Sequence, residues 1–538
     1  MSLLTLLAIS GIIFIIAYFT YGRYLNKKLG VDPNRPTPAH TMADGVDYVA
    51  ANKPVLLGHH FATIAGGGPI VGPITAVVFG WIPAVIWIIV GSIFVGGVHD
   101  FASLQASIRH RAQSIGAIIK EYIGNRGQIL FLAFSIATLM LIVGVFIILV
   151  KDTFIAVPEA ATASMLFIGL AIIFGILVNQ LRMNFILASV FGVVAMFASI
   201  WIGIKFPLSL GAGTWIVILL VYAYLASVLP VWLLLQPRDY LNSFLLYGMI
   251  GGAALGILLA NPMIKMEGYT GFYNETLGFM FPILFITIAC GAVSGFHSLV
   301  ASGTTAKQLD NEKNARFITY GAMLLEGFLA IIAIGAVAYL SQAEFAARMT
   351  ELGGPIGAFS AGVGFFMSHW GIPEVTATTF TALTASAFLL TTLDSATRLG
   401  KYGVQELAEK RSSLFSNHHI ATLTIVAGAG ALALSGTWSS VWPLFGSANQ
   451  MLGAVALLAV SVWLLKKGVK AWFAIIPMIF MFIVTVAALI VLMQTNFVSG
   501  NFFLAGAAFV LLVLCIFLII EAWRSLSSAN NKDKSIKA

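Results

Sequence analysis

Residues 58–73 read GHHFATIAGGGPIVGP, a sequence that cannot form one unbroken helix. The stretch lies inside an apolar window, residues 54–80, that is long enough to cross a bilayer. Each of the three consecutive glycines disfavours a helix by about 1 kcal/mol, and each proline removes a backbone donor. Because unwound backbone at membrane depth is tolerated only where protein buries it or where it lines a cavity, the stretch predicts an interrupted helix.

Interrupted helices form the substrate site in secondary transporters, where the N-terminus of a half-helix presents free N–H groups to an anion. The amides of Gly66, Gly67 and Gly68 are therefore candidates for binding a substrate carboxylate. A kink packed by glycine, with no ligand, is the alternative, because Gly and Pro are common in transmembrane helices.

The composition is that of a membrane protein. Of the 538 residues, 59% are hydrophobic and 9% are charged, whereas soluble domains carry about 25% charged residues. A soluble enzyme, a nucleic-acid-binding protein and a secreted scaffold are excluded. Cys290 and Cys515 both fall in apolar segments, so the sequence predicts no disulfide framework, no metal site and no cofactor.

Apolar windows separated by polar or Gly/Pro residues predict about fifteen transmembrane helices in an all-α polytopic protein. The windows are 3–20, 54–80, 83–106, 127–150, 159–180, 184–204, 213–236, 241–261, 279–303, 316–340, 374–397, 419–437, 447–465, 471–493 and 502–522. If the N-terminus lies outside, the inner loops hold 25 of the 29 Lys and Arg residues, and the outer side holds only Lys151, Lys205, Lys265 and Arg348. This asymmetry predicts an outside N-terminus and a cytoplasmic C-terminus.

A second interruption is predicted at residues 225–244 (LASVLPVWLLLQPRDYLNSF), where Pro230 lies inside the window 213–236. The two interruptions are five helices apart, an odd number, so residues 54–206 and 213–397 run in opposite senses and predict two inverted repeats. The remaining predicted parts are an N-terminal helix and cytoplasmic loop (1–53), peripheral C-terminal helices (419–522) and a cytoplasmic tail (523–538).

Two segments are too short to span the bilayer. Residues 113–124 predict an amphipathic helix on the cytoplasmic face, and residues 356–368 predict a re-entrant piece within an outer loop.

Ionisable residues inside transmembrane segments are costly, and each is a functional hypothesis. Glu326, central in the window 316–340, and Asp100 are candidates to carry a coupled proton. For Glu326 the alternative is a structural hydrogen bond to a neighbouring helix. His297 is a third candidate for ion coupling, and for each histidine a packing role between helices is an equal alternative.

Polar residues near the two predicted interruptions are candidates for contact with the substrate. His59, His60 and Arg238 supply charge complementarity or gating, and Trp232 and Gln236 are placed to close over a substrate.

Hydroxyl side chains repeat along the ninth window and its inner end. Ser294, Ser298, Ser302 and Thr305 fall on one helical stripe, which offers oxygens to the bundle interior or permits close helix packing by small residues. Lys307, just beyond, is an inside-anchoring charge or an ammonium that occupies a cation site.

Long motifs in this chain resemble one known family. The stretches MADGVDYVAANKPVLLGHHFATIAGGGPIVGPITA (42–76) and VGGVHDFASLQASIRHRAQSIGAIIKEYIG (95–124) resemble the carbon starvation protein A (CstA) family. So do LPVWLLLQPRDYLNSF (229–244), SGFHSLVASGTTAKQL (294–309), TTLDSATRLGKY (391–402) and WPLFGSANQMLGA (442–454). The enterobacterial members of the family are longer than this chain.

The resemblance implies a transporter of the bacterial inner membrane with a LeuT-like core of five plus five inverted helices and additional peripheral helices. In that fold the first and sixth core helices are broken, which here are windows 54–80 and 213–236. The eighth core helix, here 279–303, often gives adjacent hydroxyls to a sodium site, so Thr304 and Thr305 are the matching positions. Proton coupling would instead use Lys307, His297 or Glu326.

The family is associated with peptide uptake during carbon starvation, and some members look like pyruvate and proton symporters. We therefore expect a secondary transporter that imports a small, pyruvate-like carboxylate by cation symport, with H⁺ as coupling ion and Na⁺ as the alternative. Uptake of di- or tripeptides is the alternative function. No HExxH or GxSxG motif is present, and no enzyme activity is expected. The expected partners are the substrate and the lipid bilayer, with no nucleic acid.

Overall fold

The computed structural model describes residues 1–45, 48–230, 232–408 and 412–536. Within these residues, twelve helices are long and apolar enough to cross a membrane, and a bent pair makes a thirteenth span. The bent pair is α4 (Lys53–Ile64) and α5 (Gly68–Ala76), the latter continued by η1 (Val77–Phe79), with an angle of 46° between the halves. The chain is therefore an all-α polytopic membrane protein, in which the described strands are the short pair β1 (Tyr273–Asn274) and β2 (Gly278–Phe279).

The other spans follow in chain order through three parts of the chain. The first part holds α1 (Leu3–Phe19) with α2 (Tyr21–Lys28), α6 (Trp81–Gly91) with η2 (Ser92–Gly96) and α7 (Gly97–Arg109), α9 (Asn125–Ala156), α10 (Pro158–Asn179) and α11 (Phe185–Lys205). The middle part holds α13 (Leu235–Ala260), η4 (Glu312–Asn314) with α17 (Ala315–Ile318) and α18 (Tyr320–Ala338), and α21 (Glu374–Ala408). The last part holds α23 (His418–Ser435), α24 (Trp438–Lys466), α25 (Trp472–Val498) and α26 (Phe502–Ile536).

Besides the bent pair in window 54–80, two of the fifteen predicted windows do not give a single long helix. The window 213–236 gives α12 (Ala212–Val228), which has 17 residues. The window 279–303 is broken into α14 (Met280–Thr287), α15 (Phe296–Val300), the π-turn η3 (Ala301–Thr305) and α16 (Ala306–Gln308). The second interruption therefore lies at residues 288–295.

The prediction of a break inside a span at Pro230 is corrected by this structure. Helix α12 ends at Val228, and α13 begins at Leu235, so Pro230 lies in the connection between two helices. The physical reason is local, because a proline disfavours the helical conformation of the residue before it. Pro237 falls in the first turn of α13, where its missing N–H has no helical partner to lose.

The short helices are α3 (Pro38–Thr41), α8 (Ile115–Tyr122), α19 (Gln342–Glu351), α20 (Pro355–Ser368) and α22 (Ser413–Ser416). The predicted amphipathic helix at 113–124 is confirmed as α8, which buries Ile115, Ile118 and Ile119. Helix α20 covers the segment 356–368 and is buried along most of its length against α21 and α13.

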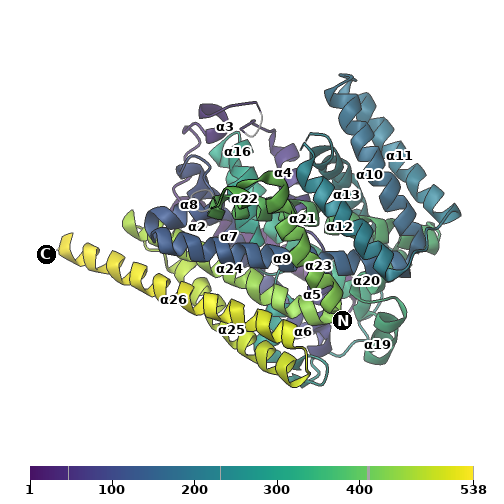
Figure 1. Cartoon of the computed structure of the whole chain (residues 1–538). Coiled ribbons are helices and arrows are strands. Elements are labelled where there is room, and N and C mark those ends of the chain that lie inside the picture. Colours follow the sequence, from purple (N-terminus) through teal and green to yellow (C-terminus); the bar gives the residue numbers. More distant parts are fainter. Residues whose placement is uncertain (46–47, 231, 409–411, 537–538) are drawn as a thin grey trace.

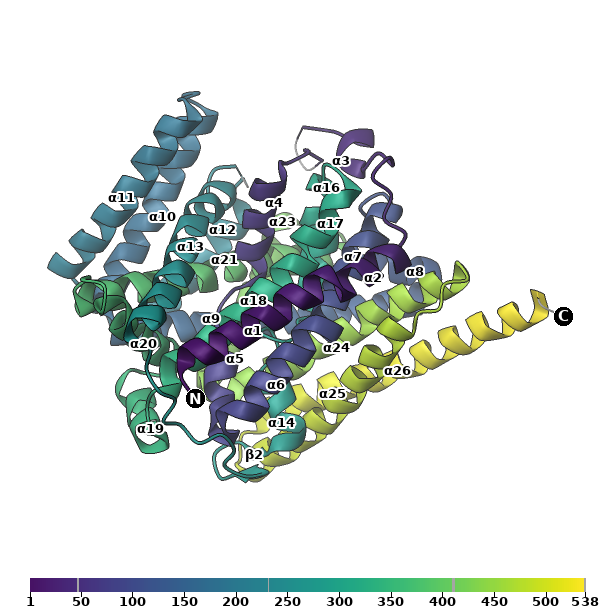
Figure 2. The same ribbon diagram turned by 180° about the vertical axis from the view of Figure 1, so that it is seen from behind.

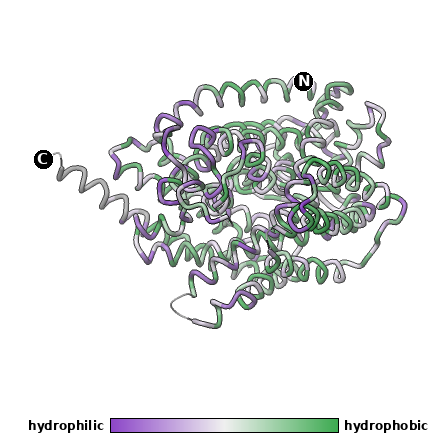
Figure 3. Tube along the Cα trace, turned by 90° about the horizontal axis from the view of Figure 1, so that it is seen from above, coloured by the Kyte–Doolittle hydropathy of each residue, from purple (hydrophilic) through white to green (hydrophobic). Residues whose placement is uncertain are grey.

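The bundle has a buried centre and lipid-facing edges. In the spans of α24, α21 and α18, 94%, 83% and 83% of the most apolar window is buried, against 28% for α11. Helices α10 and α11 lie at one side of the bundle, and α25 and α26 lie at another (Figures 1 and 2). Hydrophobic residues run along most of the helices (Figure 3), as expected where the outer faces meet acyl chains. The expectation that residues 419–522 are all peripheral is wrong for α24, because its window is the most deeply buried of all.

Candidate functional site

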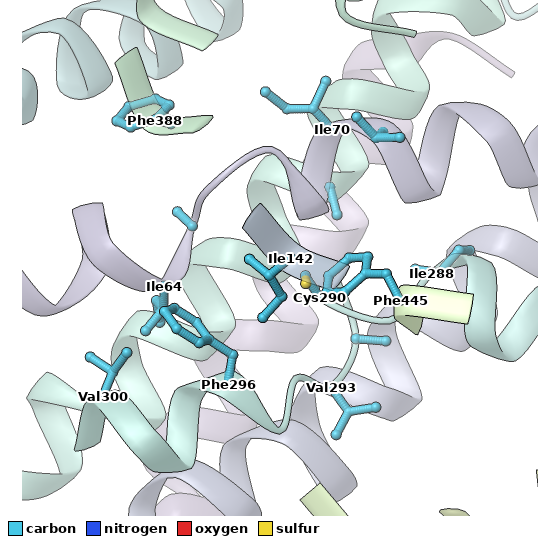
Figure 4. Packing of buried hydrophobic residues seen from close by; sticks show 14 of the residues in the cluster. Ile64, Ile70, Ile142, Ile288, Cys290, Val293, Phe296, Val300, Phe388 and Phe445 are labelled. Atoms are coloured by element: carbon cyan, nitrogen blue, oxygen red, sulfur yellow. The ribbon is translucent and has the colours of Figure 1, made fainter. Parts of the chain in front are cut away.

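The two interrupted helices meet at their breaks. A Cβ atom placed on Gly68 would lie 2.2 Å from Cβ of Cys290, and one placed on Gly72 would lie 2.4 Å from the carbonyl oxygen of Thr287. Only glycine leaves room for this contact between the start of α5 and the 288–295 break. Ile64, at the end of α4, and Cys290 belong to the same buried apolar cluster (Figure 4).

The glycine triplet packs closely on α21. Cβ atoms on Gly66 and Gly67 would lie 2.5 Å from Oγ1 of Thr392 and 2.3 Å from Cδ2 of Leu389. Among the described residues, no hydrogen bond uses the amide of Gly66, Gly67 or Gly68. The close packing of the triplet is what a glycine-packed kink without a ligand predicts. Its unused N–H donors are what a site for a carboxylate requires.

Polar side chains of α24 and α6 satisfy the backbone of the second break. The side chain of Asn449 accepts a hydrogen bond from the amide of Phe296 at 2.9 Å and donates to Oγ of Ser294 at 3.0 Å. Trp442 donates to the carbonyl of Thr287, and Trp87 donates to the carbonyl of Ile288. At membrane depth, an irregular backbone is tolerated where protein groups satisfy it in this way.

A buried charge cluster lies beside the breaks, and we call Asp100, His99, His297 and Glu326 the central cluster. Asp100 accepts hydrogen bonds from Nδ1 of His99 at 2.8 Å and from Nδ1 of His297 at 2.9 Å. Nε2 of His297 lies 3.4 Å from Oε2 of Glu326. All four side chains are fully buried, and they come from α7, α15 and α18. The structure therefore brings together three residues that the sequence proposed for ion coupling.

The hydrogen bond between His297 and Asp100 fixes the position of one proton in the central cluster. An ionised carboxylate only accepts hydrogen bonds, so Nδ1 of His297 carries a proton toward Asp100. Nε2 of His297 faces Oε2 of Glu326 across 3.4 Å without forming a hydrogen bond, so this contact joins two titratable groups in the described conformation.

His60 links the first interrupted helix to the second. Its Nδ1 lies 2.8 Å from Oγ1 of Thr305, which belongs to the π-turn η3, and its Nε2 has no hydrogen-bond partner. The hydroxyl of Thr304 donates to the carbonyl of Val300 within its own helix. The two hydroxyls expected at a sodium site therefore have different partners.

The remaining candidates of this region lie apart from the central cluster. Ser302 donates to the carbonyl of Ser298 and accepts a hydrogen bond from the amide of Ile115 at the start of α8. The ammonium of Lys307 lies 5.3 Å from the centre of the Tyr48 ring.

A second buried charge cluster joins α12, α13 and α21, and we call Arg238, Asp239, Asp394 and Tyr222 the arginine cluster. The guanidinium of Arg238 donates to the carboxylate of Asp394 and to the hydroxyl of Tyr222, and it lies 3.7 Å from Asp239. Nδ1 of His59 lies 3.6 Å from Oδ2 of Asp239. Arg238 and Asp394 are both fully buried, so each compensates the charge of the other.

Sequence reasoning placed Arg238 and His59 at a substrate site and did not identify their partners. Asp394 could have been identified from the sequence as a candidate functional residue, because it is a carboxylate inside an apolar segment. Trp232 and Gln236 lie outside both clusters, with the Trp232 side chain half-buried and that of Gln236 exposed. Within the described residues, no group of three His, Cys, Asp or Glu side chains is arranged to hold a metal ion.

Comparison with known proteins gives a consistent result. The family model described as carbon starvation protein CstA matches residues 2–353 and 347–488. The pyruvate/proton symporter BtsT of Escherichia coli is 33% identical, with 94% of this chain and 84% of that protein aligned. The peptide transporter CstA of Escherichia coli is 34% identical over 88% of this chain and 79% of that protein. The peptide transporter CstA of Bacillus subtilis is 30% identical over 100% of this chain and 99% of that protein.

Among solved structures, a manganese transporter of Eremococcus coleocola aligns with 90% of this chain and 99% of its own at 12% identity, with a TM-score of 0.41 that is too low to carry an argument. The sequence relationships, the apolar spans and the resemblance noted in the motifs agree with one another. The chain is a multi-pass membrane transporter that belongs to the carbon starvation protein CstA family.

Proposed function

We propose that this protein imports a small, pyruvate-like carboxylate together with protons, and that the central cluster carries the coupled proton. The observation that supports the proposal is the position of His297 between two fully buried carboxylates, Asp100 and Glu326. An intramembrane ionisable group surrounded by partners of this kind is typical of proton relays in transporters. The partners come from three helices, so a relative movement of α15 and α18 changes the Nε2 contact of His297.

In the proposed cycle, the proton between His297 and Glu326 is the one that is exchanged. When the imidazole holds it, the cluster contains one imidazolium between two carboxylates. When Glu326 holds it, the carboxyl is neutral and fits its apolar surroundings. Proton transfer thus alters the attraction between α15 and α18, which is a physical link between protonation and helix position.

The substrate carboxylate is proposed to bind the amides of Gly66, Gly67 and Gly68 at the start of α5. The positive end of a helix dipole and unused N–H groups favour an anion there. Because the triplet packs on Leu389 and Thr392, binding requires α21 to separate from the α4–α5 link. In this proposal, the conformation described here is one in which the carboxylate site is closed.

The proposed architecture is an inverted-repeat core in which α4–α5 and α14–α15 are the two interrupted helices. If α12 and the broken segment α14–α16 both cross the bilayer, the span count is fifteen, and the second interruption lies seven spans after the first. Seven is odd, so the two interrupted helices run in opposite senses. An outside N-terminus and a cytoplasmic C-terminus, in a bacterial inner membrane, are proposed from the Lys and Arg distribution.

Uptake of short peptides is the second candidate function. Two of the relatives named above are described as peptide transporters, and their identities of 34% and 30% bracket the 33% of the pyruvate/proton symporter. A peptide adds an ammonium group to the carboxylate, and that group needs an anionic partner. Asp100 and Glu326 are the buried carboxylates of the central cluster that offer one.

Uptake into proteoliposomes tests the proposal. Radiolabelled pyruvate is added under an imposed inward proton gradient, with and without sodium, and with excess unlabelled dipeptide as competitor. The expected result is a proton-driven accumulation of pyruvate that neither sodium nor excess dipeptide changes. Accumulation that requires sodium contradicts proton coupling, and an absence of pyruvate uptake under every gradient contradicts the proposed substrate.

A further inference from the structure

A cavity of about 190 Å³ lies at one membrane edge of the bundle, outside both charge clusters. We call it the edge cavity, and it is lined by the cationic side chains of Lys28, Arg35, Arg109 and Lys467. Lys28 ends α2, Arg109 ends α7, and Lys467 follows the last residue of α24. Three spans therefore end at this cavity, which places it at the boundary between hydrocarbon and water.

The positive charge of the edge cavity is compensated only in part. Arg109 is held by a two-point contact with the carboxylate of Glu312 and donates to the carbonyl of Gly30 at 2.6 Å. Among the described residues, no ion pair includes Lys28, Arg35 or Lys467.

The cations converge closely enough to affect one another. Burial, followed by the charges of Arg109 and Arg35, lowers the pKa of Lys467. Arg109 has the Glu312 carboxylate as its partner, whereas Arg35 and Lys467 have no ion-pair partner among the described residues, and an anion would stabilise these two charges.

The rest of the lining is apolar. Leu29, Trp463, Leu464 and Val469 complete the edge cavity, and the Lys467 ammonium lies 4.5 Å from the centre of the Trp463 ring. Leu29, Trp463 and Leu464 are themselves almost fully buried, so the open surface of the edge cavity is mainly that of the cations. At the boundary between hydrocarbon and water, the anion that meets these cations is the phosphate of a phospholipid headgroup.

We propose that the edge cavity binds the phosphate of an anionic phospholipid. The recognised chemistry is a phosphate-bearing anion, and the position of the cavity at the ends of three spans assigns it to a lipid headgroup. This side of the bundle is also the side on which 25 of the 29 Lys and Arg residues are predicted to gather, as in proteins that face an anionic leaflet. The site is independent of the substrate and of the coupling ion.

Lipid titration of the purified full-length protein in detergent tests this proposal. Phosphatidylglycerol, phosphatidylcholine and inorganic phosphate are added separately, and binding is followed by thermal unfolding and by native mass spectrometry. The test variant combines Lys28→Gln, Arg35→Gln and Lys467→Gln. The matched control combines Lys27→Gln, Lys466→Gln and Lys470→Gln, which removes the same charge from the same membrane edge without touching the cavity.

The expected result is phosphatidylglycerol binding that falls at least about tenfold in the test variant and stays within about threefold in the control. Phosphatidylcholine is expected to bind neither protein. If phosphatidylglycerol binding falls equally in the test variant and the control, the loss reflects the surface charge in general, and the proposed site is wrong. Stabilisation by inorganic phosphate as strong as that by phosphatidylglycerol would overturn the assignment to a lipid.

Folding of the test variant is checked first in phosphatidylcholine nanodiscs. If the triple variant does not give a monodisperse protein, Lys467→Gln is compared with Lys466→Gln under the same titration, with the same two outcomes deciding the proposal.

Discussion

His59 and His60 are adjacent on α4 and contact two different buried networks. Nδ1 of His59 lies 3.6 Å from Asp239 in the arginine cluster, and Nδ1 of His60 lies 2.8 Å from Thr305 on η3, next to the central cluster. Consecutive helix positions point about 100° apart, which is how one short helix reaches both. Because α4 ends at Ile64, just before the glycine triplet, any movement of α4 changes both contacts and the break together.

Glu326→Gln is expected to abolish proton-driven accumulation. The amide keeps the shape of the side chain and cannot exchange a proton with His297, so uptake under a proton gradient should fall by at least about a hundredfold. Exchange of labelled for unlabelled substrate without net proton movement should persist. Both are measured in proteoliposomes, with the exposed Glu351→Gln as the matched control. Full proton-driven uptake by Glu326→Gln would contradict the assigned role.

Asp394→Asn is expected to destabilise the protein by about 3–5 kcal/mol, because it leaves the buried Arg238 without its main counter-charge. Thermal unfolding in detergent measures the change, with the exposed Glu275→Gln as the control. The triple variant Arg238→Met, Asp239→Asn and Asp394→Leu should unfold at a higher temperature than Asp394→Asn, since it removes all three buried charges of the arginine cluster. A single variant as stable as the control would show that the pair is not electrostatically coupled.

Gly68→Ala is expected to destabilise the protein by about 1–3 kcal/mol, since its methyl group overlaps Cβ of Cys290. Cys290→Gly in the same chain should recover part of this loss. Gly213→Ala in α12 is the control, because no atom lies within 4 Å of the added carbon, and it should be neutral or stabilising. Equal melting temperatures for Gly68→Ala and Gly213→Ala would refute the close contact between the two breaks.

Asn449→Ala is expected to reduce transport and stability together. It removes the side-chain acceptor of the Phe296 amide and the donor to Ser294, and an unpaired buried group costs about 1–3 kcal/mol. Uptake and thermal unfolding are measured on the same preparation. Ser447→Ala, two residues earlier on α24, is the comparison, because its hydroxyl donates only to the carbonyl of Pro443 in its own helix. Wild-type behaviour of Asn449→Ala would mean that the second break is stable without this side chain.

Local patterns in the sequence predicted the first break and several site residues. GGGP can be read as an interruption because helix propensity is a property of consecutive residues, and Asp100, His297 and Glu326 stand out because charges are rare in apolar windows. The second break was harder to see. Its sequence, IACGAVSG at 288–295, contains no proline, and it stays irregular because Asn449, Trp442 and Trp87 satisfy its backbone. The proline at 230, a stronger local signal, marks only the link between two helices.

The sequence by itself determined that the chain is a polytopic membrane protein with an interrupted helix at residues 65–67, because hydropathy and helix propensity act over neighbouring residues. Only the tertiary structure decided which polar groups meet. Asp100 and His297 are 197 residues apart, and Arg238 and Asp394 are 156 apart. Their pairing depends on how the helices pack in three dimensions, where the cost of an isolated buried charge selects the arrangement that gives each one a partner.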